Sequence, residues 1–222
     1  MSFIETVAPS QATGEARAMY ERQQANWGYV PNYAKVFSHR PEVLARWGRL
    51  LTEIHRPMDK RRFELITFAA AHVLRNSACT LAHGKALTEF FSAEAVLAMA
   101  EQGDCENLSA AEREMMAFSR KIARDAASIE QSDIDALRRH GVGDAEIFDI
   151  VATAAGRAFF TKILDGLGVL ADAPWSSMDE ALRWSLTVGR PIDHRDAECL
   201  LDELETGASA GPRINRRQYC PR

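Results

Sequence analysis

Apolar positions along the chain recur at spacings of three and four residues, which is the pattern of amphipathic helices. The clearest stripe runs through residues 42–55, directly after Pro41, a residue favoured in the first helical turn. Runs of alternating apolar and polar residues, typical of strands, are absent. The pattern therefore predicts an all-α protein. Its helices are expected over residues 12–26, 42–55, 60–74, 78–91, 93–101, 109–125, 129–140 and 144–170, followed by two short ones at 178–186 and 194–204.

Local signals mark where several of these helices begin. Ser109 is followed three residues later by Glu112, the spacing of a capping box. Asn76 and Ser77 both have side chains that cap helices, and they separate an alanine-rich helix from the one after it. We therefore expect a sharp boundary between two helices at Asn76.

Composition narrows the class of protein. The chain has 222 residues, of which 46% are hydrophobic and 26% are charged, the proportions of a soluble globular protein. The net charge of -4 predicts no broad basic surface, so nucleic acid is not an expected partner. The sequence contains no run of about 20 apolar residues, so no membrane span is expected. The first residues do not resemble a signal peptide. The four scattered cysteines are then expected to be reduced, in a cytoplasmic protein.

The candidate chemistry lies around the boundary at Asn76. If Asn76 caps the second helix, Cys79 is its third residue, where free backbone N–H groups and the helix dipole favour a thiolate. His83 follows four residues later and therefore lies on the same helix face. Glu64, on the preceding helix, is the best candidate for a nearby carboxylate. Thiol, imidazole and carboxylate together predict a nucleophile, a base and a group that orients the base.

Simpler interpretations of the same residues stay open. A cysteine and a histidine four residues apart also occur by chance, as a buried small residue and an ordinary histidine. A metal site is not expected, because no second Cys/His pair has ligand spacing. His72 can supply a further nitrogen, but we interpret it as a core or interface residue. No glycine-rich phosphate loop or dinucleotide motif is present, so no cofactor is expected.

Glu64, Cys79 and His83 resemble the motif of the alkylhydroperoxidase D-like branch of the carboxymuconolactone decarboxylase superfamily, among proteins called peroxidase-related. Its members have a glutamate, then Cys-x-x-Cys, then a histidine four residues after the second cysteine. Residues 28–32, 108–113 and 147–168 are also similar to that branch. The resemblance implies a compact multi-helix bundle over residues 10–172 that assembles as a trimer or hexamer. The chain changes character after Pro174. Residues 173–222 are therefore expected to form a peripheral extension with two short helices and a loose tail.

One position departs from that motif. Asn76 replaces the first cysteine of the pair, so Cys79 has no neighbour with which to form the short disulfide. Oxidation of Cys79 is then expected to stop at a sulfenic acid, unless an external thiol or another cysteine resolves it. The other cysteines of the chain are Cys105, Cys199 and Cys220.

Three functions follow as hypotheses. The first is a thiol-dependent hydroperoxide reductase, an antioxidant peroxidase in which Cys79 attacks the peroxide, His83 and Glu64 relay protons, and a thiol supplies electrons. The second is an acid/base lyase acting on a small carboxylated or lactone substrate. The third is a redox-inactive oligomeric scaffold with a vestigial site.

The remaining marked residues are interpreted as structural. Arg157 is an isolated charge in an apolar helix; we expect it to pair with an acidic side chain, the alternative being that it faces a pocket. Trp27, Trp47 and Phe160 are expected to fill the core or a subunit interface.

Overall fold

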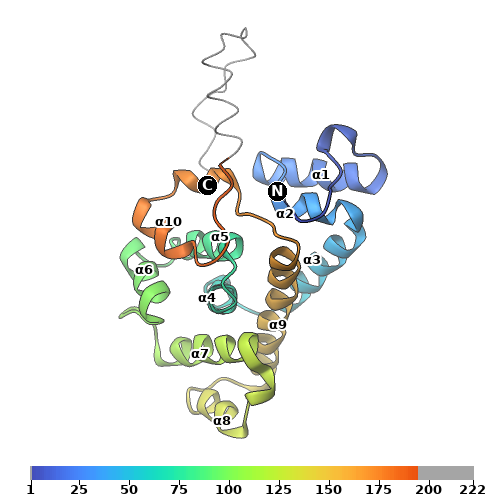
Figure 1. Ribbon diagram of the computed structural model, residues 1–222. Coiled ribbons are helices and arrows are strands. Elements are labelled where there is room, and N and C mark those ends of the chain that lie inside the picture. The colour runs from blue at the N-terminus through green and yellow to red at the C-terminus, as the bar shows by residue number, and fades with distance from the viewer. Residues whose placement is uncertain (1, 195–222) are drawn as a thin grey trace.

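The computed structural model describes residues 2–194, and helices dominate this part of the chain (Figure 1). The all-α fold predicted from the sequence is confirmed. Within residues 2–194, the only pairing of β type is a single parallel bridge between Ala171 and Ile192. The α-helices are α1 (Gly14–Trp27), α2 (Asn32–Val36), α3 (Pro41–His55), α4 (Lys60–Val73), α5 (Ser77–Leu87), α6 (Ala93–Gln102), α7 (Ala110–Asp125), α8 (Gln131–Arg139), α9 (Asp144–Gly166) and α10 (Glu180–Leu186).

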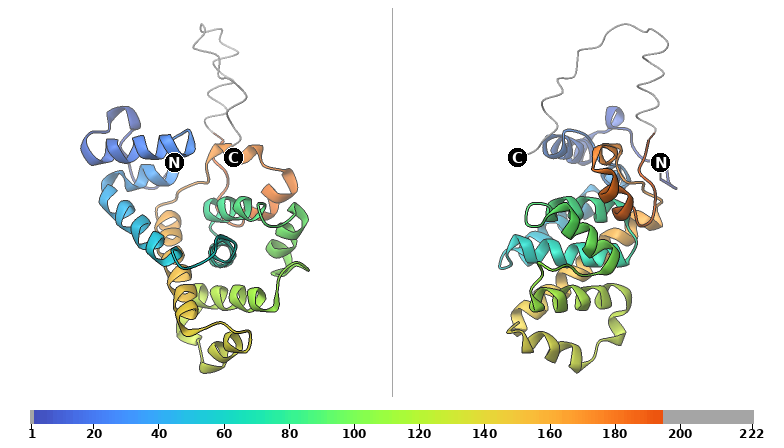
Figure 2. Two further views of the ribbon diagram at one scale, coloured as in Figure 1. Left: turned by 180° about the vertical axis from the view of Figure 1, so that it is seen from behind. Right: turned by 90° about the vertical axis from the view of Figure 1, so that its left-hand side faces the viewer.

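Helix α4 lies at the centre of the bundle, where Figure 1 and the left view of Figure 2 show it almost end-on between α5, α7 and α9. Every residue from Glu64 to Ala71 is buried, and three consecutive alanines allow the neighbouring helices to approach closely. The helix begins at Asp59, whose side chain accepts a hydrogen bond from the Arg62 N–H. A central helix buried on all sides fixes the position of any polar side chain that it carries.

Three apolar clusters pack around this helix. One joins α4 and α5 to α6 and α10, a second joins α1, α2, α3 and α9, and a third joins α4, α7, α8 and α9. Cys79 belongs to the second cluster, so α5 contributes its sulfur to the side of the bundle formed by α1, α3 and α9. The candidate site therefore lies between the central helices and the N-terminal helices.

Some helix boundaries differ from those predicted. The long helix predicted to reach residue 170 ends at Gly166, because Gly168 adopts a left-handed φ of 74°. The N–H of Val169 then bonds the carbonyl of Leu164 at 2.9 Å, which closes the helix in a Schellman motif. The short helix α2 was not predicted. The helix predicted at 194–204, apart from its first residue, and the loose tail lie outside the described residues.

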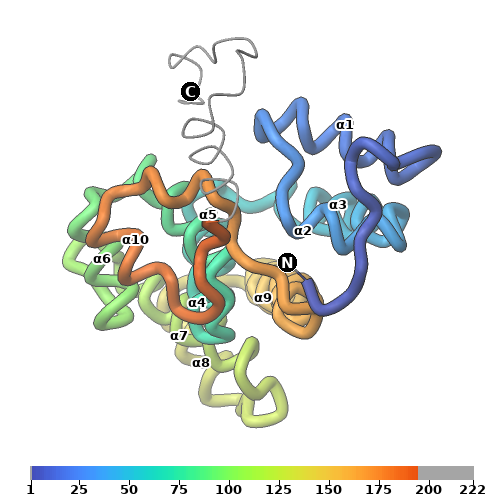
Figure 3. Tube along the Cα trace, turned by 45° about the horizontal axis from the view of Figure 1, so that its top comes forward, coloured from blue at the N-terminus to red at the C-terminus, as the bar shows by residue number. Residues whose placement is uncertain are grey.

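The C-terminal part of the described chain packs against α5 and α6, as Figure 3 shows for α10. Leu186 of α10 lies against Gly84 of α5, where a Cβ would meet it at 2.6 Å. Residues 187–193, here called the strap, then cross the junction between α4 and α5. The N–H of Gly189 donates to Ser77 Oγ at 2.9 Å, and Arg75 Nε donates to the Val188 carbonyl at 3.1 Å. The strap therefore holds the start of α5. The domain boundary at residue 172 stays a prediction.

Within residues 2–194, every helix is too short or too polar to cross a membrane.

Candidate active site

The junction between α4 and α5 positions Cys79. Arg75 adopts a left-handed φ of 59°, which turns the chain between the two helices. Asn76 follows as the N-cap of α5, and its Oδ1 accepts a hydrogen bond from the Cys79 N–H at 2.9 Å. The helix start predicted at Asn76 is therefore confirmed. At this position an amide caps the helix and leaves no second thiol beside Cys79.

Glu64 and His83 form a buried pair between α4 and α5. Glu64 Oε2 lies 2.6 Å from His83 Nδ1, and both side chains are largely shielded from solvent. Because an ionised carboxylate accepts only, this contact assigns the proton of a neutral imidazole to Nδ1 and leaves Nε2 as an acceptor. The structure thus brings together the carboxylate and the imidazole that the sequence suggested. Their roles in catalysis stay predictions.

A cavity of about 410 Å³ lies beside this pair. Cys79 and His83 of α5 both line it, as expected for residues four apart on one helix face. Helices α1, α3 and α9 supply most of the opposite wall. Glu64 is not part of the lining and lies behind His83. The aromatic residues of the lining are Trp27, Tyr33, Trp47, Phe160 and Trp175.

Arg157 of α9 faces the cavity and contacts the sulfur. Its side chain is buried, with 6% of the residue exposed, and Nη1 lies 3.5 Å from Cys79 Sγ. The guanidinium also lies over the rings of Trp47 and Phe160, at 5.5 and 5.6 Å from their centroids. The expected pairing with an acidic side chain is wrong, since no described carboxylate lies within ion-pair distance of Arg157. The fold places this face of α9 against α3 and α5, where a sulfur and two rings surround the charge.

Burial sets the ionisation of the site. It raises the pKa of the Cys79 thiol, and the charge and hydrogen bond of Arg157 only partly oppose this. The sequence led us to expect a thiolate favoured by the helix start, and the structure corrects this expectation because only 4% of Cys79 is exposed. The resting form at neutral pH is therefore the thiol.

The same environment keeps His83 neutral. Burial and the charge of Arg157 lower the pKa of His83, although Glu64 acts in the opposite direction. Burial tends to raise the pKa of Glu64, but its hydrogen bond with His83 and the nearby positive charges outweigh this and lower the pKa. The site at neutral pH therefore holds a thiol, a neutral imidazole able to accept a proton, and a carboxylate.

The raised thiol pKa predicts the pH dependence of Cys79 alkylation. Only the thiolate reacts with iodoacetamide, so the rate should rise with pH and reach half its maximum above the ordinary thiol value of about 8.5. In Arg157→Met the opposing charge is lost, so the midpoint should move to still higher pH. Mass spectrometry of the peptide that contains Cys79 measures alkylation of this residue separately from that of the other cysteines. A plateau already reached below pH 8 would contradict this assignment.

The other candidate residues lie away from this cavity. Cys105 is buried in the apolar cluster of α6, whereas Cys79 belongs to a different cluster. Cys199 and Cys220 lie outside the described residues. His72 packs beside Phe68 on α4 and does not line the cavity. Among residues 2–194, no group of three His, Cys, Asp or Glu side chains is arranged to hold a metal ion.

Asp172 is a polar cavity residue that the sequence did not indicate. Its Oδ1 accepts a hydrogen bond from the N–H of Asn32 at 2.6 Å, and burial raises its pKa to about 6. The contact joins residues 140 positions apart in the chain. The only related signal was the turn at residues 28–32, which resembled the alkylhydroperoxidase D-like branch.

Comparison with known proteins identifies solved structures that have a similar fold. No model of a known protein family and no curated protein matches the sequence. Among solved structures, an uncharacterised peroxidase-related protein from Ralstonia eutropha, described as an alkylhydroperoxidase AhpD core, is 20% identical with a TM-score of 0.65, covering 85% of this chain and 98% of its own. A peroxidase-related protein from Silicibacter sp. is 21% identical with a TM-score of 0.65, covering 79% and 91%.

A third solved structure of similar fold belongs to an enzyme that is described as a debrominase and not as peroxidase-related. It is a cysteine-to-alanine variant of the debrominase Bmp8 in complex with 2,3,4-tribromopyrrole, 17% identical with a TM-score of 0.63, covering 84% of this chain and 98% of its own. Together these likenesses show that the chain has the alkylhydroperoxidase D-like fold, as the resemblance implied.

Proposed function

We propose that the protein is a thiol-dependent reductase of small organic hydroperoxides, with Cys79 as the reacting residue. The observation that carries the proposal is the arrangement around the cavity: a thiol and a neutral imidazole line it together, and a carboxylate bonds the imidazole at 2.6 Å. Solved structures of similar fold described as peroxidase-related support the choice of chemistry.

The reaction begins with ionisation of the buried thiol. His83 Nε2 accepts the proton from Cys79, and Glu64 stabilises the imidazolium through Nδ1. Arg157, 3.5 Å from the sulfur, stabilises the thiolate as it forms. These contacts compensate in part for the cost of placing a negative charge in a buried site.

Oxygen transfer follows. The thiolate attacks the terminal oxygen of the hydroperoxide, forming an S–O bond while the O–O bond breaks. The departing alkoxide takes the proton held by His83 and leaves as an alcohol. Cys79 is oxidised to a sulfenic acid by two electrons, and the hydroperoxide is reduced by the same two.

An external thiol completes the cycle. One thiol molecule condenses with the sulfenic acid, releasing water and leaving a mixed disulfide on Cys79. A second thiol displaces Cys79 and forms the free disulfide of the donor. Asn76 occupies the position from which a neighbouring cysteine would resolve the sulfenic acid. Because position 76 carries no thiol, the electrons are supplied by the external thiol.

The experiment combines turnover with trapping of the intermediate. With cumene hydroperoxide and dithiothreitol, the full chain should consume peroxide catalytically. In the absence of thiol, dimedone should label Cys79 as a sulfenic acid with close to one label per chain. A variant with Cys105, Cys199 and Cys220 all changed to serine should give the same labelling and turnover. Absence of both label and turnover in the wild-type protein would contradict the proposal.

The acid/base lyase remains the alternative. Its support is the same neutral His83 held by Glu64, a pair that can move protons on a small carboxylated or lactone substrate without the sulfur. The debrominase of similar fold also indicates that this architecture is compatible with activities other than peroxide reduction. The reductase requires the sulfur of Cys79, whereas the lyase does not.

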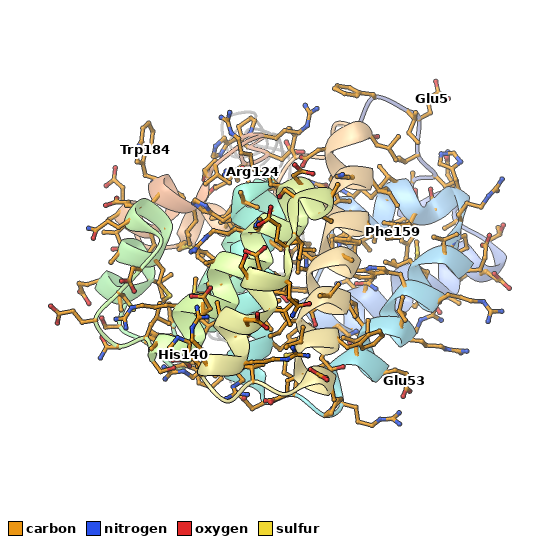
Figure 4. All side chains as sticks on the ribbon, turned by 90° about the horizontal axis from the view of Figure 1, so that it is seen from below. Glu5, Glu53, Arg124, His140, Phe159 and Trp184 are labelled. Carbon is orange, nitrogen blue, oxygen red and sulfur yellow. The ribbon has the colours of Figure 1, made fainter. Side chains whose placement is uncertain are left out.

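Assembly and location stay proposals. The predicted trimer or hexamer would need an apolar surface, and Phe148, Val151 and Phe159 are exposed on one face of α9. Trp184 of α10 is also exposed, and Figure 4 shows it on the other side of the molecule from Phe159. A cytoplasmic location is proposed from the wide scatter of the cysteines along the sequence.

A further inference from the structure

The environment of Arg157 is unusual for a buried positive charge. Only 6% of the residue is exposed, and among residues 2–194 no carboxylate lies within ion-pair distance. Its one hydrogen bond within the described chain goes to Cys79 Sγ, and its Nε has no partner. A buried cation without a paired anion is costly, so such a residue is rarely retained for packing alone.

The nearby groups compensate this charge incompletely. Cys79 is a neutral thiol in its resting form, so it supplies a dipole and no full charge. Glu64 attracts Arg157 from a distance, but its Oε2 bonds His83 and it does not line the cavity. The cavity side of Arg157 is therefore a position at which an anion would be stabilised.

The surrounding wall is aromatic. Trp47 and Phe160 stack with ring centroids 4.2 Å apart and planes at 10°, and Tyr33 meets Phe160 edge-on at 5.4 Å. All three side chains and Arg157 line the same cavity of about 410 Å³, which is within the size range of small-molecule sites. Such a wall favours a planar ring over a flexible aliphatic chain, because ring faces and edges pack with defined geometry.

We propose that this cavity binds a planar aromatic ligand that carries one negative charge, with the charge against Arg157 and the ring against Trp47 and Phe160. The inference deepens the proposed function, on which it rests for the reacting group: the substrate class becomes an aromatic hydroperoxide with an acidic substituent. Binding of the ring and the charge does not itself require the sulfur.

Calorimetric titration of the full chain tests the proposal with three probes of similar size. Benzoate has the ring and the charge, benzamide has the ring alone, and cyclohexanecarboxylate has the charge alone. Benzoate should bind at least about tenfold more tightly than either of the others. Equal binding of benzamide would show that the charge is not recognised, equal binding of cyclohexanecarboxylate would show that the ring is not, and no binding of benzoate would overturn the site altogether.

Variants assign the charge to Arg157. Arg157→Met should lose about tenfold or more in benzoate affinity with little change for benzamide, and Arg157→Lys should retain part of the preference. Arg22 is an exposed arginine that also lines the cavity, so Arg22→Met is the matched control. If Arg22→Met loses the preference for benzoate over benzamide and Arg157→Met keeps it, the assignment of anion recognition to Arg157 is wrong. Thermal unfolding of each variant verifies that it is folded, and the lysine variant supplies the test if the methionine variant is not.

The titrations separate this inference from the proposed function. Cys79→Ser should still bind benzoate as the wild type does, although it cannot reduce a hydroperoxide. Benzoate binding without any hydroperoxide turnover by the wild-type protein would leave the anion site standing and reject the reductase. Turnover of cumene hydroperoxide without benzoate binding would reject the anion site and leave the reductase standing.

Discussion

Replacing Cys79 with serine should reduce hydroperoxide turnover to the uncatalysed background while leaving the protein folded. A serine hydroxyl does not ionise near neutral pH and is a poor nucleophile towards a peroxide oxygen. The substitution is close to isosteric at a residue that is 4% exposed, and the helix cap uses the backbone N–H of residue 79 and not its side chain. Peroxide consumption and a thermal unfolding curve measure the two effects. Unchanged turnover in Cys79→Ser would reject the reductase.

The variant His83→Ala distinguishes the remaining functions. A reductase should lose roughly 10²- to 10⁴-fold in rate, because proton transfer to and from the sulfur is no longer assisted. An acid/base lyase would survive Cys79→Ser and fail in His83→Ala. A scaffold with a vestigial site would show no turnover in the wild type and no change in either variant.

Gly189→Ala should lower the free energy of unfolding, because the added methyl group collides with the main chain at the junction of α4 and α5. A Cβ at Gly189 would lie 1.9 Å from the carbonyl oxygen of Arg75, and backbone atoms cannot move aside as a side-chain tip does. Overpacking of this kind costs about 1–3 kcal/mol or more, which lowers the Tm of a chain of this size by roughly 2–4 °C per kcal/mol. Calorimetry measures the shift.

The same change should also reduce turnover, because the strap contacts the start of α5. Gly189 donates to Ser77 Oγ, and Ser77 lies two residues before Cys79. Gly166→Ala is the matched control: it adds the same methyl group in α9, where nothing lies within 4 Å. It should change stability by no more than about 1 kcal/mol and in the stabilising direction. Equal Tm values for the two variants would show that the strap does not press on the junction.

The sequence predicted those parts of the fold that local rules decide. The capping box at Ser109 is formed, and Asn76 caps α5 as expected, because both depend on side chains within three residues of the helix start. The end of α9 was placed too late, since apolar residues continue beyond Gly166 and hide the turn. The short helix α2 has too few residues for a periodic pattern to show.

Within the site, the sequence alone determined that Cys79 and His83 share one helix face, because four residues make about one turn. It also suggested Glu64 as their partner, and the structure joins Glu64 to His83. Only the tertiary structure could bring Arg157, 78 positions away in the chain, to the sulfur. Burial, which is likewise a property of the packed molecule, decides that the resting sulfur is a thiol despite its place at a helix start.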